Sequence, residues 1–414
     1  MSSPSSTNAR TWLGAAIAAI IAILIRYGAM EALPDSLLHK PADDPDAYVL
    51  IAHQFSSTGI YAREAGVPTA YRPPGYTIAI APWCANERPD VRGIAFLHLV
   101  AAGLTAGITV LWAASMNLGP WSWLAGILVA IDPLLIRQST LIMSETLFTA
   151  LFMGGIYCLS IGTDQRRSKG WLILSGVLFG LATLTRPIAG VVLLSIGLGA
   201  LLSGKTRGWI ITAVVAFVTL FPWGIRNQMV LGRPILTTTH GGYTLWLGQN
   251  PTFYSEVVTG KNAVWPKESF DEWTAANLRS TQGMTEIEQD AFFRNEAVKW
   301  MTEHPSEAAN SILYHVRSIW GVTPRTDSKG FGLLVTAYYV ALMLAIIFVG
   351  VRFLPKLFAW PGWIITFAVL SFTAVHAIYW SDMRMRAPLA PLLAVVIAGG
   401  CATLGRGKNG MDES

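Results

Sequence analysis

Long apolar runs dominate the chain, separated by short polar turns and by two long polar segments. A helix that crosses the ~30 Å hydrocarbon layer of a bilayer needs a continuous apolar run of roughly 16 to 20 residues. Ten runs fit this description, at residues 11–29, 91–112, 120–136, 144–161, 170–185, 188–202, 209–225, 331–350, 358–377 and 388–404. The pattern therefore predicts an all-α polytopic membrane protein with about ten transmembrane helices.

Composition agrees with this class, because 52% of the residues are hydrophobic and only 13% are charged, far from the balance of a soluble domain. The first apolar run continues past Arg26 to Met30 without a clear small-x-small cleavage site, so we interpret it as a retained anchor, not a signal peptide. Three cysteines, Cys84, Cys158 and Cys401, are scattered and indicate neither a disulfide framework nor a metal motif.

Charge along the tails and short loops predicts the orientation, because cytoplasmic connections retain Lys and Arg. The tails and short loops on one side contain ten basic residues but only three acidic ones. The basic residues are Arg10, Arg166, Arg167, Lys169, Lys205, Arg207, Arg352, Lys356, Arg406 and Lys408, and the acidic ones are Asp164, Asp412 and Glu413. Both termini are therefore expected in the cytoplasm, and the two long polar segments on the periplasmic or outer face of the cell's inner (cytoplasmic) membrane.

The polar segments divide the chain into three parts. Residues 1–225 form an N-terminal membrane module that includes the first polar segment (about 30–90), residues 226–330 form the second polar segment, and residues 331–414 return to the membrane. Apolar spacing in 286–301, and Pro305 opening a run through Trp320, predict amphipathic helices in the second segment. The first segment has eight acids and four bases, which excludes a nucleic-acid surface.

Asp44 begins the first candidate motif, just before Pro45 and a helix-compatible run at 47–55. It is either the N-cap of that helix, with proline at the first helical position, or a general base held at the membrane surface. Asp46 is either a first-turn acid that complements the helix dipole or a second reactive carboxylate.

Glu145 and four arginines form the second candidate group. Glu145 lies at the mouth of the fourth predicted span, where an acid is costly unless it is paired, hydrated or bound to a cation; it could also be an ordinary helix-start acid capped by Ser144. The arginines on the same side are Arg186, Arg226, Arg384 and Arg386. Each alone could be a snorkelling residue, but together they suggest a site for a lipid-linked phosphate, whose oxygens match the guanidinium fork.

His240 opens a polar stretch in which Tyr243 and Trp246 could stack on a sugar ring, or simply be buried in a loop. His53 on the first polar segment is a weaker candidate ligand. With carboxylates and histidines available, a divalent cation is a possible cofactor, although no fixed spacing indicates a metal site.

Six short motifs occur in a shared order: DPDAY at 44–48, YRPPGY at 71–76, SETLF at 144–148, LTRP at 184–187, PWGIRN at 222–227 and RMRAP at 384–388. In this order the chain resembles bacterial GT-C glycosyltransferases related to protein O-mannosyltransferases and lipid A aminoarabinose transferases. The resemblance spans nearly the whole chain.

The resemblance implies a GT-C-like architecture, a polyprenyl-phosphate-sugar donor, a hydroxyl acceptor on a lipid, glycan or protein, and inverting transfer of a hexosyl or pentosyl group. In this family the first outer loop supplies the catalytic carboxylate, commonly as an Asp-Glu pair four residues before an aromatic. Asp44 matches that place relative to Tyr48, but Pro45 replaces the second acid, so Asp46 either assists or substitutes. This departure also weakens any metal site carried over from the family.

The predicted site therefore has three groups of residues. The catalytic group is Asp44, Asp46 and Glu145; the phosphate-binding group is Arg226, Arg186, Arg384, Arg386 and Arg72; the substrate-binding group is Tyr48, Tyr76, Asn227, His240, Tyr243 and Trp246.

Two other functions stay open at this point. A polyprenyl-lipid flippase or solute transporter would also have ten helices, but would place polar groups near the bilayer midplane and often show inverted repeats, which are not visible here. A non-catalytic membrane subunit of an envelope assembly system would explain the second polar segment without a reactive Asp44.

Overall fold

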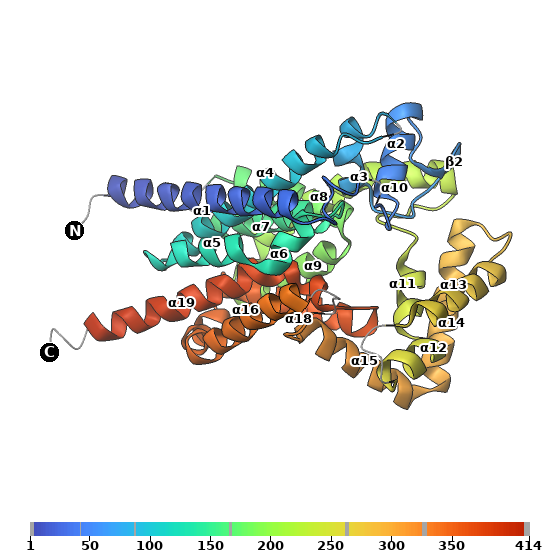
Figure 1. Cartoon of the computed structure of the whole chain (residues 1–414). Helices are drawn as coiled ribbons and strands as arrows, with labels where there is room; N and C mark the ends of the chain where they lie inside the picture. The colour runs from blue at the N-terminus through green and yellow to red at the C-terminus, as the bar shows by residue number, and fades with distance from the viewer. Residues whose placement is uncertain are drawn as a thin grey trace.

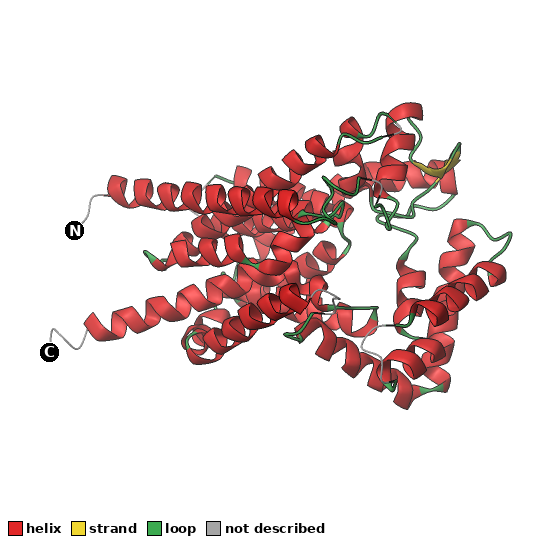
Figure 2. Cartoon of the chain, in the orientation of Figure 1, coloured by secondary structure: helices red, strands yellow, loops and turns green. Residues whose placement is uncertain are grey.

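The computed structural model describes residues 4–41, 43–86, 88–164, 168–260, 265–324 and 329–409. This part of the chain is almost entirely helical, with one short hairpin (Figure 2). Five residues that contribute to the charge patterns above lie outside the described residues: Glu87, Arg166, Arg167, Asp412 and Glu413.

The membrane module is a bundle built from both ends of the chain. Its elements are α1 (Pro4–Ala32), α4 (Val91–Ser115), α5 (Trp121–Ile131), α6 (Pro133–Ser139), α7 (Glu145–Gly162), α8 (Gly170–Thr185), α9 (Ile188–Leu202), α10 (Thr206–Leu231), α16 (Lys329–Phe348), η3 (Gly350–Phe353), α17 (Leu354–Leu357), α18 (Gly362–Ile378), η4 (Met383–Leu389) and α19 (Ala390–Asn409).

The two polar segments fold outside this bundle. The first contains α2 (Tyr48–Thr58), the antiparallel strands β1 (Ala62–Glu64) and β2 (Val67–Pro68), α3 (Pro74–Ile80) and η1 (Ala81–Trp83). The second contains α11 (Gly241–Gly248), α12 (Pro251–Phe253), the π-helix η2 (Tyr254–Val258), α13 (Lys267–Ser280), α14 (Glu286–Glu303) and α15 (Pro305–Trp320). Figure 1 shows both segments at one end of the bundle, hereafter the loop end, and the start of α1 and the end of α19 at the opposite end.

All ten predicted apolar runs are helical. Within the described residues, six helices are long and apolar enough to cross a membrane by themselves, namely α1, α4, α7, α10, α16 and the continuous η4–α19. The predicted run 358–377 contains α18, which forms a pair with the preceding helical piece Gly350–Leu357 that is bent by 100°, and α5, α8 and α9 are shorter apolar helices. The prediction of an all-α polytopic membrane protein is confirmed.

The predicted span 120–136 differs, because it is two helices and not one. Asp132 separates α5 from α6, and its carboxylate accepts the backbone N–H groups of Leu134 (3.0 Å) and Leu135 (2.9 Å). Pro133 has no N–H to donate and starts a new helix readily, so the pair ends α5 and caps α6. After this break the chain forms the short helix α6, and Arg137 lies in its last turn.

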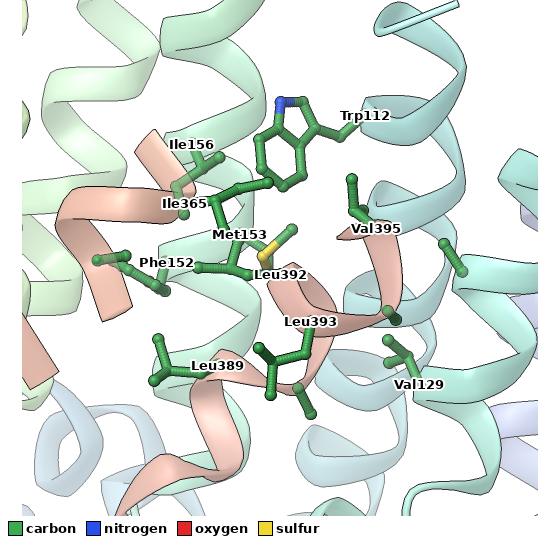
Figure 3. Packing of buried hydrophobic residues seen from close by; sticks show 14 of the residues in the cluster. Trp112, Val129, Phe152, Met153, Ile156, Ile365, Leu389, Leu392, Leu393 and Val395 are labelled. Carbon is green, nitrogen blue, oxygen red and sulfur yellow. The ribbon is translucent and has the colours of Figure 1, made fainter. Parts of the chain in front are cut away.

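The centre of the bundle is a close-packed apolar core, in which side chains from α7, α18 and α19 interdigitate, among them Phe152, Ile365 and Leu392 (Figure 3). Most of the η4–α19 span is buried inside the protein, whereas α10 and α16 are largely exposed apolar helices. An exposed apolar helix is stable where lipid, not water, surrounds it, so α10 and α16 are expected to face the bilayer.

A glycine lets the first polar segment rest on the bundle. A Cβ on Gly75 of α3 would lie 2.9 Å from the carbonyl of Leu184 and 2.5 Å from the Thr185 hydroxyl, too close for any side chain. The next residue, Tyr76, is fully buried and its hydroxyl bonds His98 Nε2 of α4 at 2.9 Å. The YRPPGY motif therefore anchors the segment against α8 and α4.

The second polar segment matches its predicted helices, since α14 and α15 fall where the apolar spacing and Pro305 indicated. It also contacts the first segment. The carboxylate of Glu286, the first residue of α14, accepts the Ala70 N–H at 2.9 Å and the hydroxyls of Thr69 and Thr239. The two polar segments thus meet above the loop end of the bundle.

Candidate active site

Asp44 is the cap of α2. Its carboxylate accepts the backbone N–H groups of Tyr48 (2.8 Å), Val49 (2.8 Å) and Leu50 (3.0 Å). The N-cap interpretation placed Pro45 at the first helical position. The helix begins at Tyr48 instead, so Pro45 precedes it. Burial raises the pKa of Asp44 above its usual value, and the three N–H donors only partly oppose this shift. The carboxylate is fixed in position yet stays partly exposed.

Asp46 forms an ion pair with Arg72, at 2.6 Å between Oδ1 and Nη2. The Nε of Arg72 also donates to the Asp46 carbonyl at 2.9 Å, and its guanidinium lies over the ring of Tyr71 at 5.0 Å. Arg72 is held by both the side chain and the backbone of Asp46, so the pair links the start of α2 to the YRPPGY motif.

Glu145 is 1% exposed and pairs with Arg186 at 2.9 Å. Arg186 Nη1 also donates to the Ser144 hydroxyl oxygen (3.3 Å), which accepts a second hydrogen bond from the Tyr48 hydroxyl (3.2 Å). Ser144 precedes α7 but its side chain does not cap that helix. The contacts instead join α2, α7 and the turn between α8 and α9 in one cluster.

Arg384 enters the same cluster from η4. Its Nη1 lies 3.7 Å from the sulfur of Met143, the residue before Ser144, while Arg186 Nη2 lies 3.3 Å from the sulfur of Met385. Arg384 also pairs with Asp382 at 3.1 Å. These contacts bring two arginines that are distant in sequence to the mouth of α7, around Glu145.

The remaining predicted arginines hold the chain in place. Arg226 donates to the carbonyls of Tyr61 (2.9 Å) and Thr69 (2.7 Å) and to Asn227 Oδ1 (2.8 Å). The amide of Asn227 in turn donates to the Ile235 carbonyl at 2.6 Å. Arg226 and Asn227 are therefore engaged with backbone at the end of α10.

Arg386 is also engaged with backbone, at the end of α15. Its Nη1 donates to the carbonyls of Ile319 and Gly321 at 2.6 Å, and its guanidinium lies 4.4 Å from the ring centre of Tyr339. It is 1% exposed, so it tethers α15 and α16 to η4.

The predicted aromatic residues fall into two groups. Tyr48 packs edge-on against Tyr76 at 5.0 Å and belongs to the Glu145 cluster. His240 lies between Tyr71 (4.5 Å) and Tyr243 (5.1 Å), and burial lowers its pKa well below the usual value, so it is neutral. Trp246 bonds Asn277 at 3.0 Å within the second polar segment, and no described contact joins it to the cluster.

Two cavities adjoin the cluster. The smaller, about 190 Å³, is lined by Asp43 and Pro45 on either side of Asp44, and by Met143 and Arg384. The larger, about 330 Å³, shares Arg137, Leu141 and Arg384 with it. Sequence reasoning missed Arg137 and considered Ser144 only as a helix cap. The polar run Arg-Gln-Ser-Thr at 137–140, inside an otherwise apolar stretch, was the available signal for Arg137.

Metal ligands do not gather here: in the described ranges no group of three or more His, Cys, Asp or Glu side chains could hold an ion. Asp46 and Glu145 are each paired with an arginine, and His53 Nδ1 bonds the Cys84 carbonyl at 2.9 Å. Among the described residues, the carboxylates of Asp46 and Glu145 are therefore engaged by arginines and are not gathered as a metal site.

Residues 88–225 match the family described as dolichyl-phosphate-mannose-protein mannosyltransferase. The matched range contains Glu145 and Arg186 but not Asp44 or Arg384. No curated protein matches the chain in sequence.

Solved structures give a broader likeness. The archaeal oligosaccharyltransferase AglB from Archaeoglobus fulgidus, in complex with an inhibitory peptide and a dolichol-phosphate, is 15% identical with a TM-score of 0.53, over 94% of this chain and 50% of that one. ArnT from Cupriavidus metallidurans bound to undecaprenyl phosphate is 13% identical with a TM-score of 0.39, over 88% and 74%. The family model thus matches residues 88–225 of the chain, and AglB shares its fold.

Proposed function

We propose that the chain is an inverting glycosyltransferase that moves a hexosyl or pentosyl group from a polyprenyl-phosphate donor to a hydroxyl group of a lipid, glycan or protein. The reaction would take place on the periplasmic or outer face of the inner membrane. The family match supports this proposal, as does the dolichol-phosphate held by AglB, which shares the fold.

The observation that carries the proposal is the convergence of Arg186 and Arg384 on the buried Glu145 at the loop end. Arg186 pairs with Glu145 and Arg384 with Asp382, so two guanidinium groups are held in place where the membrane helices meet the polar segments. A sugar phosphate that loses its sugar develops negative charge on the phosphate, and fixed cations in a partly dry site stabilise that charge strongly. Glu145 acts as a positioning residue that aligns Arg186.

Asp44 is the proposed general base. The three N–H bonds fix its carboxylate, and a carboxylate with two oxygens has lone pairs left to accept an acceptor hydroxyl proton. The acceptor oxygen would form a bond to C1 of the sugar as the bond between C1 and the phosphate oxygen breaks. The proton goes to Asp44 and the polyprenyl phosphate leaves, so the configuration at C1 inverts.

The pair of Asp46 and Arg72 has a supporting role in this scheme. Arg72 is the third cation near the cluster, and its bonds to Asp46 keep it beside Tyr48 and Tyr71. The Asp46 carboxylate is engaged by Arg72, so it is less available to an acceptor hydroxyl than that of Asp44.

Mass spectrometry of envelope glycans and glycolipids, from cells with and without the protein, tests the function. A mass difference of one sugar in the absence of the protein identifies both the sugar and the acceptor. Purified protein should then transfer that sugar from its polyprenyl phosphate, and Arg186→Gln should transfer it about tenfold to hundredfold more slowly, because a charged partner of the phosphate is lost. Arg352→Gln, at the opposite end of the bundle, serves as the control. Unchanged glycans and no transfer would favour a transporter or a non-catalytic subunit.

The proposed sidedness has a separate test. Arg279→Cys on α13 should react with an impermeant thiol reagent in intact or outer-permeabilised cells, whereas Arg207→Cys at the start of α10 should react only after the inner membrane is broken. The reverse pattern would move the site to the cytoplasm and exclude a donor presented on the outer face.

A further inference from the structure

The larger cavity, about 330 Å³, is not part of the Glu145 cluster, although Arg384 borders both. It lies among α6, α15, the start of α16 and η4. Its lining residues are Leu134, Arg137, Gln138, Leu141, Arg317, Ser318, Gly321, Thr323, Pro324, Phe331, Asp382, Met383 and Arg384. The volume falls in the range of small-molecule sites, and the lining combines apolar walls with a few polar groups, as such sites do.

Positive charge dominates the polar part of the wall. Among the described lining residues Arg137, Arg317 and Arg384 are positive and Asp382 is negative, and Asp382 pairs with Arg384 at 3.1 Å. Arg137 pairs with Asp35, which lines the smaller cavity instead. Arg317 is exposed and makes no ion pair with another described residue. Three guanidinium groups around one space favour an oxyanion.

Gln138 is an independent sign of a ligand. Its side chain lines the cavity, is 3% exposed, and its Oε1 finds no hydrogen-bond partner among the described residues. Buried polar groups in folded proteins are nearly always hydrogen-bonded, and the oxygen and nitrogen of a carboxamide exchange places by a flip. As assigned, Oε1 would accept from a ligand hydroxyl; after a flip, the amide N–H groups at the same place would donate to a ligand oxygen.

We propose that this cavity is an oxyanion-binding subsite for a phosphate-type group on a lipid-borne substrate, separate from the cluster around Glu145. The apolar wall of Leu134, Leu141 and Phe331 continues onto the lipid-facing helix α16, which gives a lipid chain a route of entry. The proposal rests on the proposed function for its substrate class. The phosphate belongs either to the polyprenyl donor or to an anionic acceptor, and both sources need the same chemistry.

Arg317 offers the cleanest test, because it is exposed on α15, lines only the larger cavity and has no part in the Glu145 cluster. The full-length protein in nanodiscs is titrated with undecaprenyl phosphate, and then with inorganic phosphate after saturation with that lipid. Arg317→Gln keeps a polar side chain of similar reach but removes the charge. Arg317→Lys restores the charge without the fork. Arg279→Gln, exposed on α13, is the matched control.

Arg317→Gln should weaken the binding of one of the two ligands about tenfold, and Arg317→Lys should recover part of that loss. Arg279→Gln should bind both ligands like the parent protein. Weaker binding of undecaprenyl phosphate by Arg317→Gln assigns the cavity to the donor. Unchanged binding of undecaprenyl phosphate together with weaker binding of inorganic phosphate assigns the cavity to an acceptor anion. Equal binding of both ligands by Arg317→Gln and the parent protein overturns the subsite.

This readout is independent of sugar transfer. If binding depends on Arg317 but no transfer is ever detected, the subsite stands and the proposed reaction fails. If transfer is detected while Arg317→Gln binds both ligands normally, the reaction stands and the subsite fails.

Discussion

The carboxylates of the candidate site come from two regions at the loop end, a membrane helix and the first polar segment, and these regions differ in what surrounds the carboxylates. Glu145 belongs to a membrane helix, is 1% exposed and lies between arginines that come from the α8–α9 turn and η4. Asp44 and Asp46 belong to the first polar segment and are partly exposed; backbone N–H groups hold one and a single arginine holds the other. Glu145 is engaged by Arg186, whereas the Asp44 carboxylate is held by backbone N–H groups and keeps lone pairs that can accept a proton.

The comparison therefore divides the work at the site. Glu145 is expected to keep the arginines in place, and Asp44 to carry the proton. Three substitutions and one pH profile test this division, and their expected effects range from loss of stability to a small loss of transfer.

Glu145→Ala should have the largest effect, because it leaves Arg186 without its counter-charge in a mostly buried position. Breaking such a pair by removing one partner costs about 3 kcal/mol or more. Thermal unfolding in detergent should shift to lower temperature, and sugar transfer should fall below detection. The double variant Glu145→Gln with Arg186→Gln removes both charges and should recover much of the stability but none of the transfer. Normal stability of Glu145→Ala would contradict a structural pair.

Asp44→Asn should leave stability nearly unchanged and reduce turnover about a hundredfold or more. Asparagine caps a helix about as well as aspartate, but it does not accept a proton at neutral pH. Turnover, KM for the donor and thermal stability are measured together. If turnover stays near normal, Asp44 is only the cap of α2 and the base has been assigned wrongly.

The pH dependence of sugar transfer tests whether Asp44 is the general base. Burial raises the pKa of Asp44, and a general base must be ionised, so transfer should decline as pH falls through a pKa above the ordinary aspartate value, about tenfold for each further unit. The stability effect has the opposite direction: the folded protein binds this proton more readily than the unfolded chain, so the contribution is fullest at low pH and is lost as pH rises through the folded pKa. The pH–rate profile of a slower Asp44→Asn enzyme should lack the acidic limb.

Asp46→Asn should have the smallest effect, a loss in transfer of less than about fivefold, because partly exposed ion pairs contribute under about 1 kcal/mol. Arg72 keeps its bond to the Asp46 carbonyl and its contacts with the rings of Tyr48 and Tyr71. Donor KM is the sensitive measurement. A loss larger than that of Asp44→Asn would transfer the catalytic role to Asp46 and reverse the division proposed here.

The sequence by itself determined the membrane class, the ten apolar helical runs, the two polar segments and the helices α14 and α15. These features follow from local patterns. The length of an apolar run predicts a membrane helix, and apolar spacing together with a proline predicts where an amphipathic helix begins. It also identified Asp44 as a cap residue, although the helix starts at Tyr48, because Ala47 adopts a left-handed conformation (φ 59°) that no local pattern announces.

Only the tertiary structure decided which charged residues share a site. Arg226, Arg186, Arg384 and Arg386 look alike in sequence, yet two reach the mouth of α7 and two bond the backbone that anchors α10 and α15. Their partners lie tens to hundreds of residues away, so no spacing along the chain distinguishes them. The same holds for Arg137 and Gln138, whose place beside a cavity depends on how α6, α15 and η4 pack after the break at Asp132.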